Sequence, residues 1–133
     1  MRILLVEDIQ SMRLLMRHML RSMGLNDIIE AIDGSTAIQV LQAEKIDLIV
    51  SDWLMEPLSG LDLLRHVRAD KTLAPIPFIM VSCQNTAENI GLAHKTGVNG
   101  YLIKPFGMTT FSKQIRRFIE IPAPSKKTVK RPG

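Results

Sequence analysis

Four short apolar runs, each ending abruptly in a hydroxyl or charged residue, constrain the fold of this chain most strongly. Residues 3–6 run into Glu7 and Asp8, residues 48–51 into Asp52, residues 78–81 into Ser82, and residues 100–103 into Lys104. Stretches of helical period separate the runs, and this alternation is typical of repeated βα units. In an open parallel sheet, ligands bind beyond the carboxyl ends of the strands. The sequence therefore predicts an α/β domain with these polar residues at one edge of its sheet.

The spacing of the apolar residues predicts five helices and one further strand, over residues 28–31. The expected inward faces are Met12, Leu15, Met16, Met19, Leu20 and Met23; Ala37, Ile38 and Leu41; Leu61, Leu64 and Val67; Ala87, Ile90 and Ala93; and Phe111, Ile115 and Phe118 or Ile119. Right-handed crossovers leave few ways to arrange five such repeats, and the common small arrangement is a doubly wound parallel sheet with strand order 2-1-3-4-5. That order makes Glu7, Asp8 and Asp52 neighbours.

Composition and charge place one domain over residues 1–121, followed by a basic tail over residues 122–133. The chain has 133 residues and a formal net charge of +4. Four basic residues lie in the tail without an acid, which leaves 13 basic and 13 acidic residues in the domain. A Pro/Lys/Ser/Thr segment of this kind is typical of disorder. We therefore expect the basic charge to belong to a tail, and nucleic-acid binding is not favoured because the tail lacks aromatic residues.

The apolar runs are too short to cross a membrane, and no signal peptide is recognisable. A single cysteine, Cys83, rules out an internal disulfide and fits a reducing compartment. These features predict a cytoplasmic protein that does not enter a membrane.

Three carboxylates at one sheet edge predict a divalent cation site. Crowded carboxylates repel one another, so a proton or a cation must offset their charge. Mg²⁺ together with the ammonium of Lys104 would balance three negative charges. Mg²⁺ prefers octahedral oxygen ligation. We expect Asp8 and Asp52 to bind it directly, Glu7 to act through water, and the backbone carbonyl of Leu54 to complete the protein ligands.

The same edge has the groups that phosphoryl transfer requires. A carboxylate is a competent nucleophile toward phosphorus, and catalysis of this transfer is mainly positioning and electrostatic stabilisation. Asp52 is the predicted nucleophile, Ser82 the hydrogen-bond donor and Lys104 the ion-pair partner of the phosphoryl group. No separate base is needed, because a carboxylate is ordinarily ionised near neutral pH.

The stretches LLVED, SDW, MVS and GYLIKPF, in this order and spacing, resemble the receiver domain of two-component response regulators, and in particular its stand-alone chemotaxis (CheY-like) members. The resemblance extends to about residue 120. It implies a flavodoxin-like fold and Mg²⁺-dependent transfer of a phosphoryl group from a sensor histidine kinase to Asp52. It further implies that Ser82 and Tyr101 shift on phosphorylation and remodel the face made by the fourth helix, fifth strand and fifth helix. The peptide bond between Lys104 and Pro105 would be cis.

Such a protein is a signalling switch rather than an enzyme, although it assists its own phosphorylation and dephosphorylation. Its expected partners are the histidine kinase and a downstream target, either the flagellar motor or another signalling protein. The oligomeric state is left open between a monomer and a dimer that forms on phosphorylation.

Three positions depart from the family pattern. Proline usually lies four residues after the phospho-acceptor, but here Glu56 has that place and the proline follows at position 57. Leu54 stands where chemotaxis-type regulators commonly carry a polar residue. Gln84 stands where the family often has an acid. Because the last two positions flank the phosphoryl group in the family, the rate of dephosphorylation does not follow from the resemblance.

Three other readings have different requirements. The tail could link the domain to a DNA-binding or enzymatic output domain. An aspartate-nucleophile phosphatase would need a general acid, typically an aspartate two residues after the nucleophile, where Leu54 lies. A flavin-binding protein of the same fold would have to bring a phosphate to the loop where Glu7 and Asp8 repel it.

Overall fold

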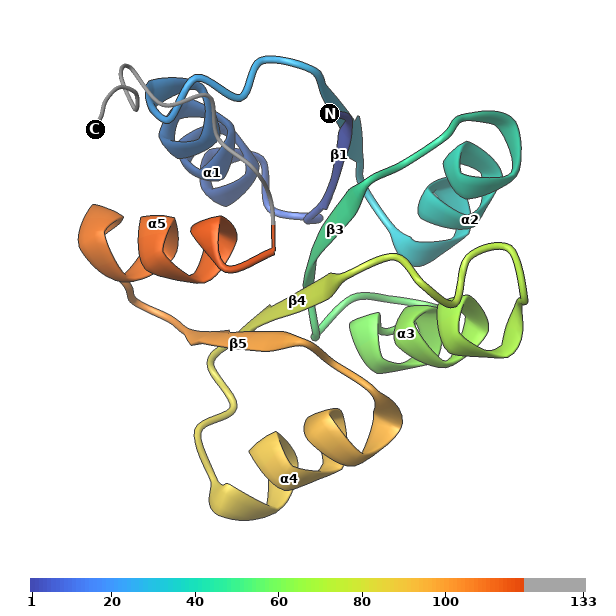
Figure 1. Ribbon diagram of the computed structural model, residues 1–133. Coiled ribbons are helices and arrows are strands. Elements are labelled where there is room, and N and C mark those ends of the chain that lie inside the picture. Colours follow the sequence, from blue (N-terminus) through green and yellow to red (C-terminus); the bar gives the residue numbers. More distant parts are fainter. Residues whose placement is uncertain (119–133) are drawn as a thin grey trace, which may run out of the picture.

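A computed structural model describes residues 1–118; the predicted tail over residues 122–133 and the expected helical end at Ile119 lie outside the described residues. The five strands are β1 (Ile3–Val6), β2 (Ile28–Ala31), β3 (Leu48–Asp52), β4 (Phe78–Ser82) and β5 (Gly100–Ile103). They form one sheet in the order β2-β1-β3-β4-β5, and every neighbouring pair is parallel (Figure 1). The predicted flavodoxin-like topology is confirmed.

Five helices alternate with the strands. They are α1 (Gln10–Ser22), α2 (Gly34–Ala43), α3 (Gly60–Ala69), α4 (Ala87–Thr96) and α5 (Met108–Arg116). Three of the helices have an N-terminal cap, a side chain that accepts a backbone N–H of the first turn. The caps are Asp33 for α2, Ser59 for α3 and Thr86 for α4. At the end of α4, Gly97 has a φ of +114°, a left-handed conformation that glycine adopts without a steric penalty.

Helices cover both faces of the sheet. In Figure 1, α1 and α5 lie on one side of the strands, and α2 and α3 lie on the other. Alternate strand residues accordingly belong to two apolar cores. Leu4 and Ile49 pack in the core that contains residues of α2, α3 and α4, whereas Ile3 and Val50 pack with α1 and α5. A strand buried on both faces must be apolar at successive positions, which is why β1, β3 and β4 read as continuous apolar runs.

Two of the expected inward-facing residues are exposed. On α1 the buried stripe is Met16, Met19 and Leu20, while Leu15 is 44% exposed. Leu15 lies about 100° around the helix from Met16, outside the stripe that faces the sheet. On α4 the side chain of Ala87 is exposed and only Ala93 is buried. The fourth helix therefore packs less deeply than its apolar spacing predicts.

No helix within residues 1–118 has the length and apolar character needed to span a bilayer.

Arg68, which projects from α3, joins three segments that are distant in sequence. Its guanidinium donates to the carbonyl oxygen of Gly97 at 2.9 Å and to the carbonyl oxygens of Ala74 and Ile76 at 2.9 and 2.8 Å. It also donates to the side-chain oxygen of Asn99 at 2.7 Å. Burial lowers the pKa of this guanidinium, yet the group remains charged at any physiological pH. Arg68 thus fixes α3 to the loops that precede β4 and β5.

Replacement of Arg68 is expected to destabilise the fold much more than replacement of its exposed neighbour on the same helix. Arg68→Met keeps the aliphatic stem but leaves three backbone carbonyls without their donor, so we expect the free energy of unfolding to fall by about 2–3 kcal/mol. Arg65→Met removes only an exposed pair with Asp62 and should cost under about 0.5 kcal/mol. Urea denaturation measures both, and equal losses would contradict this role.

Candidate functional site

The sheet order brings three carboxylates together at the carboxyl ends of β1 and β3. Val6 pairs with Ser51 across these two strands, so the residues that follow, Glu7 and Asp52, emerge side by side. One carboxylate oxygen from each of Glu7, Asp8 and Asp52 lies within 4.8 Å of the others. Glu7 and Asp52 are buried and Asp8 is exposed. The predicted acidic cluster is therefore present, with one side open to solvent.

Lys104 bridges the two buried acids. It follows β5, and its ammonium lies 3.2 Å from a carboxylate oxygen of Glu7 and 3.2 Å from one of Asp52. Its side chain is 11% exposed. The backbone N–H of Lys104 donates to the carbonyl of Ser82, which holds the start of this segment against β4. A lysine predicted from its place after a strand thus supplies the positive charge within the cluster.

The single ammonium does not neutralise the acids. Burial and the charge of Asp52 raise the pKa of Glu7 from 4.5 to about 7, although Lys104 acts in the opposite direction. Burial also raises the pKa of Asp52, again against the effect of Lys104. Burial disfavours the charged form of Lys104, but the two carboxylates outweigh this effect and raise its pKa. The site has an excess of negative charge that a proton or a further cation can offset.

Ser82 ends β4 next to this cluster. The residue before it, Val81, pairs with Asp52 across β3 and β4. The Ser82 hydroxyl oxygen accepts the backbone N–H of Gln84 at 2.9 Å. An accepting hydroxyl keeps its own proton available. Ser82 is fully buried, so its hydroxyl group is shielded from bulk water.

Tyr101 is half-buried on β5 and reaches the same loop. Its hydroxyl donates to the carbonyl oxygen of Gln84 at 2.7 Å, and burial raises the pKa of the phenol. The Tyr101 ring meets the ring of Trp53 edge to face, with centroids 6.3 Å apart. Trp53 directly follows Asp52 in the chain. Because the Trp53 indole lies next to Asp52 in the chain and against the Tyr101 ring, its fluorescence is a natural reporter of this region.

The loop after β3 shows where the departures from the family pattern lie. The side chain of Leu54 is 57% exposed and points an apolar group into solvent beside the cluster. The Glu56–Pro57 and Lys104–Pro105 peptide bonds are both cis, the second as the resemblance implies. Gly60 donates its N–H to the Trp53 carbonyl at 2.8 Å, and a Cβ at Gly60 would lie only 2.1 Å from the carbonyl oxygen of Asp52. Only glycine permits α3 to begin this close to the site.

Two residues contribute to the site in ways that their sequence positions do not reveal. Arg13 donates to the backbone carbonyl of Glu7 at 2.9 Å and pairs with Glu30 on β2, which holds the acidic segment in place. Gln84 binds both Ser82 and Tyr101 through its backbone. Arg13 lies on the first turn of α1, five residues after Asp8, and this position is only a weak signal. The contacts of Gln84 with Ser82 and Tyr101 use backbone atoms, so its residue type does not predict them.

The carboxylates and the lysine lie at the switch point of a doubly wound sheet. Proteins of this fold class bind their ligands there, beyond the carboxyl ends of the strands. The model of the response regulator receiver domain matches residues 3–116. The chain belongs to this family. Chemotaxis protein CheY-3 of Vibrio cholerae is 38% identical over 120 residues, which cover 90% of this chain and 92% of the relative. Chemotaxis protein CheY of Pseudomonas aeruginosa is 39% identical over 90% of this chain and 97% of its own length.

Solved structures agree with this assignment. The chemotaxis protein CheY4 of V. cholerae superposes with a TM-score of 0.82 at 28% identity, covering 89% of this chain and 98% of that one. The receiver domain of a sensor histidine kinase from P. aeruginosa, solved with a magnesium ion coordinated in its active-site cleft, has a TM-score of 0.79 at 27% identity, covering 88% of this chain and 95% of that one. Receiver domains are signalling switches rather than enzymes in the ordinary sense, and they interact with histidine kinases and downstream targets.

Without divalent cations, the stability of the protein should fall as Glu7 ionises. The folded pKa of Glu7 lies above its ordinary value, so the folded state holds the proton more tightly than the unfolded chain. The stabilising effect of this proton is complete below pH 4.5 and is lost as the pH rises through about 7. We expect the difference in unfolding free energy between wild type and Glu7→Gln to change by up to about 1.4 kcal/mol per pH unit in this window.

Urea denaturation with a chelator present, at half-unit steps from pH 5 to pH 8, measures this dependence. Glu88→Gln, which alters an exposed glutamate on α4, is the matched control and should follow the wild type. Parallel curves for wild type and Glu7→Gln would contradict the raised pKa.

Proposed function

We propose that this protein is a chemotaxis-type response regulator that accepts a phosphoryl group on Asp52 from the phosphohistidine of a sensor histidine kinase, in a reaction that requires Mg²⁺. The observation that carries the proposal is the buried carboxylate of Asp52, 3.2 Å from the Lys104 ammonium and within 4.8 Å of the carboxylates of Glu7 and Asp8. Relatives named as chemotaxis proteins, 38% and 39% identical over 90% of the chain, support the same conclusion.

The donor set fits Mg²⁺. The cluster offers only oxygen ligands, from two buried carboxylates and one exposed carboxylate, and its charge exceeds what Lys104 balances. Asp8 and Asp52 would bind the ion directly, Glu7 through water, and Leu54 through its backbone carbonyl. When bound, Mg²⁺ supplies positive charge that brings the anionic phosphoryl group toward an anionic nucleophile. The exposed side at Asp8 leaves a route by which the ion and the phosphoryl donor can enter.

The residues of this chain then have distinct roles in the transfer. A carboxylate oxygen of Asp52 forms a bond to phosphorus while the bond between phosphorus and the kinase's imidazole nitrogen breaks, and the nitrogen keeps the electron pair. The Lys104 ammonium pairs with an oxygen of the incoming phosphoryl group. The Ser82 hydroxyl donates its free proton to another such oxygen. These groups are held by strand ends before the donor arrives, so little reorganisation opposes the transfer.

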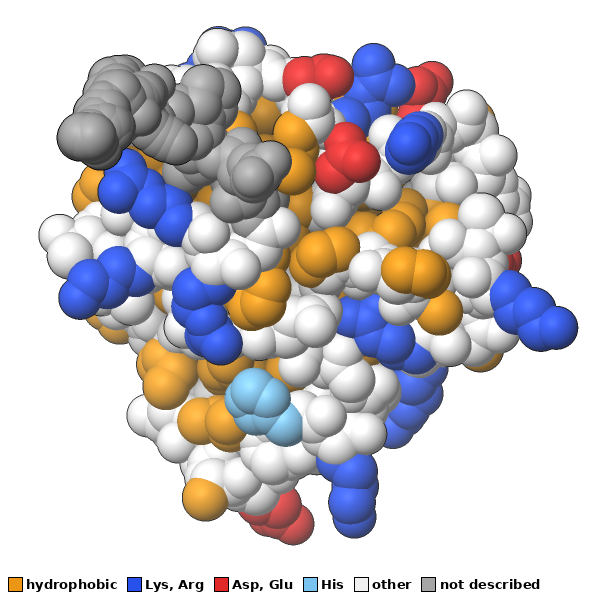
Figure 2. Space-filling model, in the orientation of Figure 1, with side chains coloured by type: hydrophobic (Ala, Val, Ile, Leu, Met, Phe, Trp, Pro, Cys, Tyr) orange, Lys and Arg blue, Asp and Glu red, His pale blue; other side chains and the backbone are white. Residues whose placement is uncertain are grey.

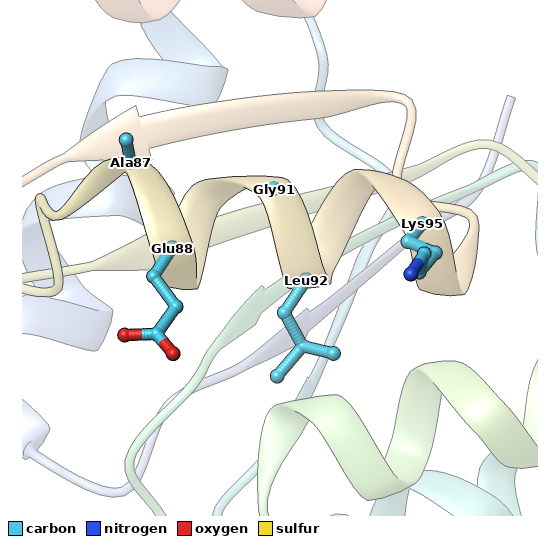
Figure 3. Close-up of a pocket in the computed structure, with 5 residues that line it drawn as sticks. All are labelled: Ala87, Glu88, Gly91, Leu92 and Lys95. Carbon is cyan, nitrogen blue, oxygen red and sulfur yellow. The ribbon is translucent and has the colours of Figure 1, made fainter.

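Phosphorylation would act as a switch through Ser82 and Tyr101. Movement of the Ser82 hydroxyl toward the phosphoryl group would alter the Gln84 segment, to which Tyr101 is hydrogen-bonded. The output surface would be the face formed by α4, β5 and α5. A shallow pocket also lies along α4, on the side of the helix from which Glu88 and Leu92 project, and this side points away from β5 (Figure 3). The target would be the flagellar motor or another signalling protein.

A receiver whose tail leads to a further output domain is not favoured, because the match with the chemotaxis relatives covers 92% and 97% of their own lengths. The phosphatase alternative is not favoured, since the residue two after Asp52 is the exposed apolar Leu54 and not an acid. Nucleic-acid binding by the domain itself is also not favoured. Figure 2 shows lysine and arginine side chains scattered over the visible face, without the continuous basic patch that such binding requires.

A phosphoryl mimic tests the proposal. Mg²⁺ followed by beryllofluoride should change Trp53 emission in the wild type, because the mimic occupies the position beside Asp52. Asp52→Asn keeps the shape but loses the ionised oxygen, and its response should be abolished. Asp27→Asn, at the opposite end of the sheet, is the control and should respond fully. A response of equal size in Asp52→Asn would mean that the acceptor is a different residue.

A second measurement identifies the bond that forms. A labelled phosphoryl group transferred from a phosphorylated histidine kinase should be released from the wild type by hydroxylamine, as expected of an acyl phosphate, and should be absent from Asp52→Asn. A label stable to hydroxylamine would point to a hydroxyl acceptor instead.

A further inference from the structure

Gln84 occupies a junction between the two strand ends of the switch and the start of α4. Its backbone N–H binds the Ser82 hydroxyl at 2.9 Å, and its backbone carbonyl binds the Tyr101 hydroxyl at 2.7 Å. Its side-chain oxygen accepts from the side-chain amide of Asn89, on the first turn of α4, at 2.9 Å. Three elements, β4, β5 and α4, therefore meet at one residue.

The first half of α4 depends on few other contacts. The one buried residue of this helix is Ala93, in its second half. Gly91 lies in the middle of the helix, although a side chain would fit there, because a Cβ at this position would have no neighbour within 4 Å. A glycine within a helix costs about 1 kcal/mol relative to alanine. Elements with little buried surface and weak local propensity are those that open most readily. One side-chain hydrogen bond can therefore decide where the start of α4 lies.

We propose that the Gln84–Asn89 hydrogen bond is the link through which a change at Ser82 reaches α4, and that Asn89 is a positioning residue of this switch. The Ser82 hydroxyl can donate to a phosphoryl oxygen while it continues to accept from the Gln84 backbone, so Gln84 moves with Ser82. The side chain of Gln84 then carries Asn89 with it. This inference rests on the proposed phosphorylation of Asp52 and adds the route from that site to the output helix.

Asn89→Ala isolates the link. Asn89 lies outside the phosphoryl site, and its backbone N–H remains bound by the Thr86 hydroxyl at 3.1 Å, so the N-terminal cap of the helix is retained. Alanine has the higher helix propensity, so any loosening of α4 cannot come from propensity. Asn85→Ala removes an amide from an exposed residue of the same loop that makes no side-chain hydrogen bond among residues 1–118, and it serves as the matched control.

The experiment combines two readouts on each protein: Trp53 emission for binding of Mg²⁺ and beryllofluoride, and hydrogen exchange of the α4 amides with and without the mimic. We expect Asn89→Ala to bind the mimic within about twofold of the wild type, and its α4 amides to exchange about fivefold faster before the mimic is added. The change that the mimic causes in α4 exchange should be lost in Asn89→Ala and retained in Asn85→Ala.

Gln84→Ala removes the same hydrogen bond from its other side and keeps both backbone contacts. The double variant of Gln84 and Asn89 should therefore show the same α4 exchange as either single variant, whereas additive effects would overturn the link. A normal α4 response to the mimic in Asn89→Ala would also overturn it, with the proposed function intact, as would loss of mimic binding in Asn89→Ala alone. Absence of mimic binding in the wild type would instead overturn the proposed function, and the link with it.

Discussion

The ion pairs of Lys104 with Glu7 and Asp52 are the interaction on which the site depends. Both distances are 3.2 Å, in a region where the acids are buried and the lysine is nearly so. Removing charges from water is costly unless they are paired, and here one positive charge serves two carboxylates. Burial is the main cause of the raised pKa of both acids, and the single ammonium of Lys104 does not reverse its effect. A site whose carboxylates outnumber its positive charges has a physical reason to take up a cation, and in the proposed function that cation would attract a phosphoryl group.

The residues of the proposed phosphoryl site and the helix of the proposed output surface differ in depth of packing. Glu7, Asp52 and Ser82 follow or end strands whose residues are almost completely buried, so their positions are fixed by the interior of the sheet. By contrast, α4 has a single buried residue and a glycine at its middle. Rigid groups suit a reaction that depends on positioning, whereas a shallowly packed helix suits a surface that must change. The burial of the strands follows from the apolar runs in the sequence, whereas α4 packs less deeply than its apolar spacing predicts.

Much of this could be predicted because parallel-sheet topology converts strand ends into neighbours. The strand order and the meeting of Glu7, Asp52 and Lys104 need only the apolar runs and the residues that end them. Features that depend on side-chain direction or loop path could not be predicted in this way. The exposure of Leu15 follows from the rotation of α1 against the sheet, and the four hydrogen bonds of Arg68 require two loops to be in place. The spacing of apolar residues in the sequence predicts neither the exposure of Leu15 nor the hydrogen bonds of Arg68.

The residue type at position 84 matters for only one of the three hydrogen bonds that this residue makes. Two of its three hydrogen bonds use backbone atoms, so they would survive any substitution that preserves the loop. The third needs a side-chain acceptor of the right length, which glutamine and glutamate both provide. A glutamate would add a negative charge to the loop that follows Ser82. Glutamine keeps the acceptor for Asn89 without that charge, so this departure from the family pattern is compatible with the proposed link to α4.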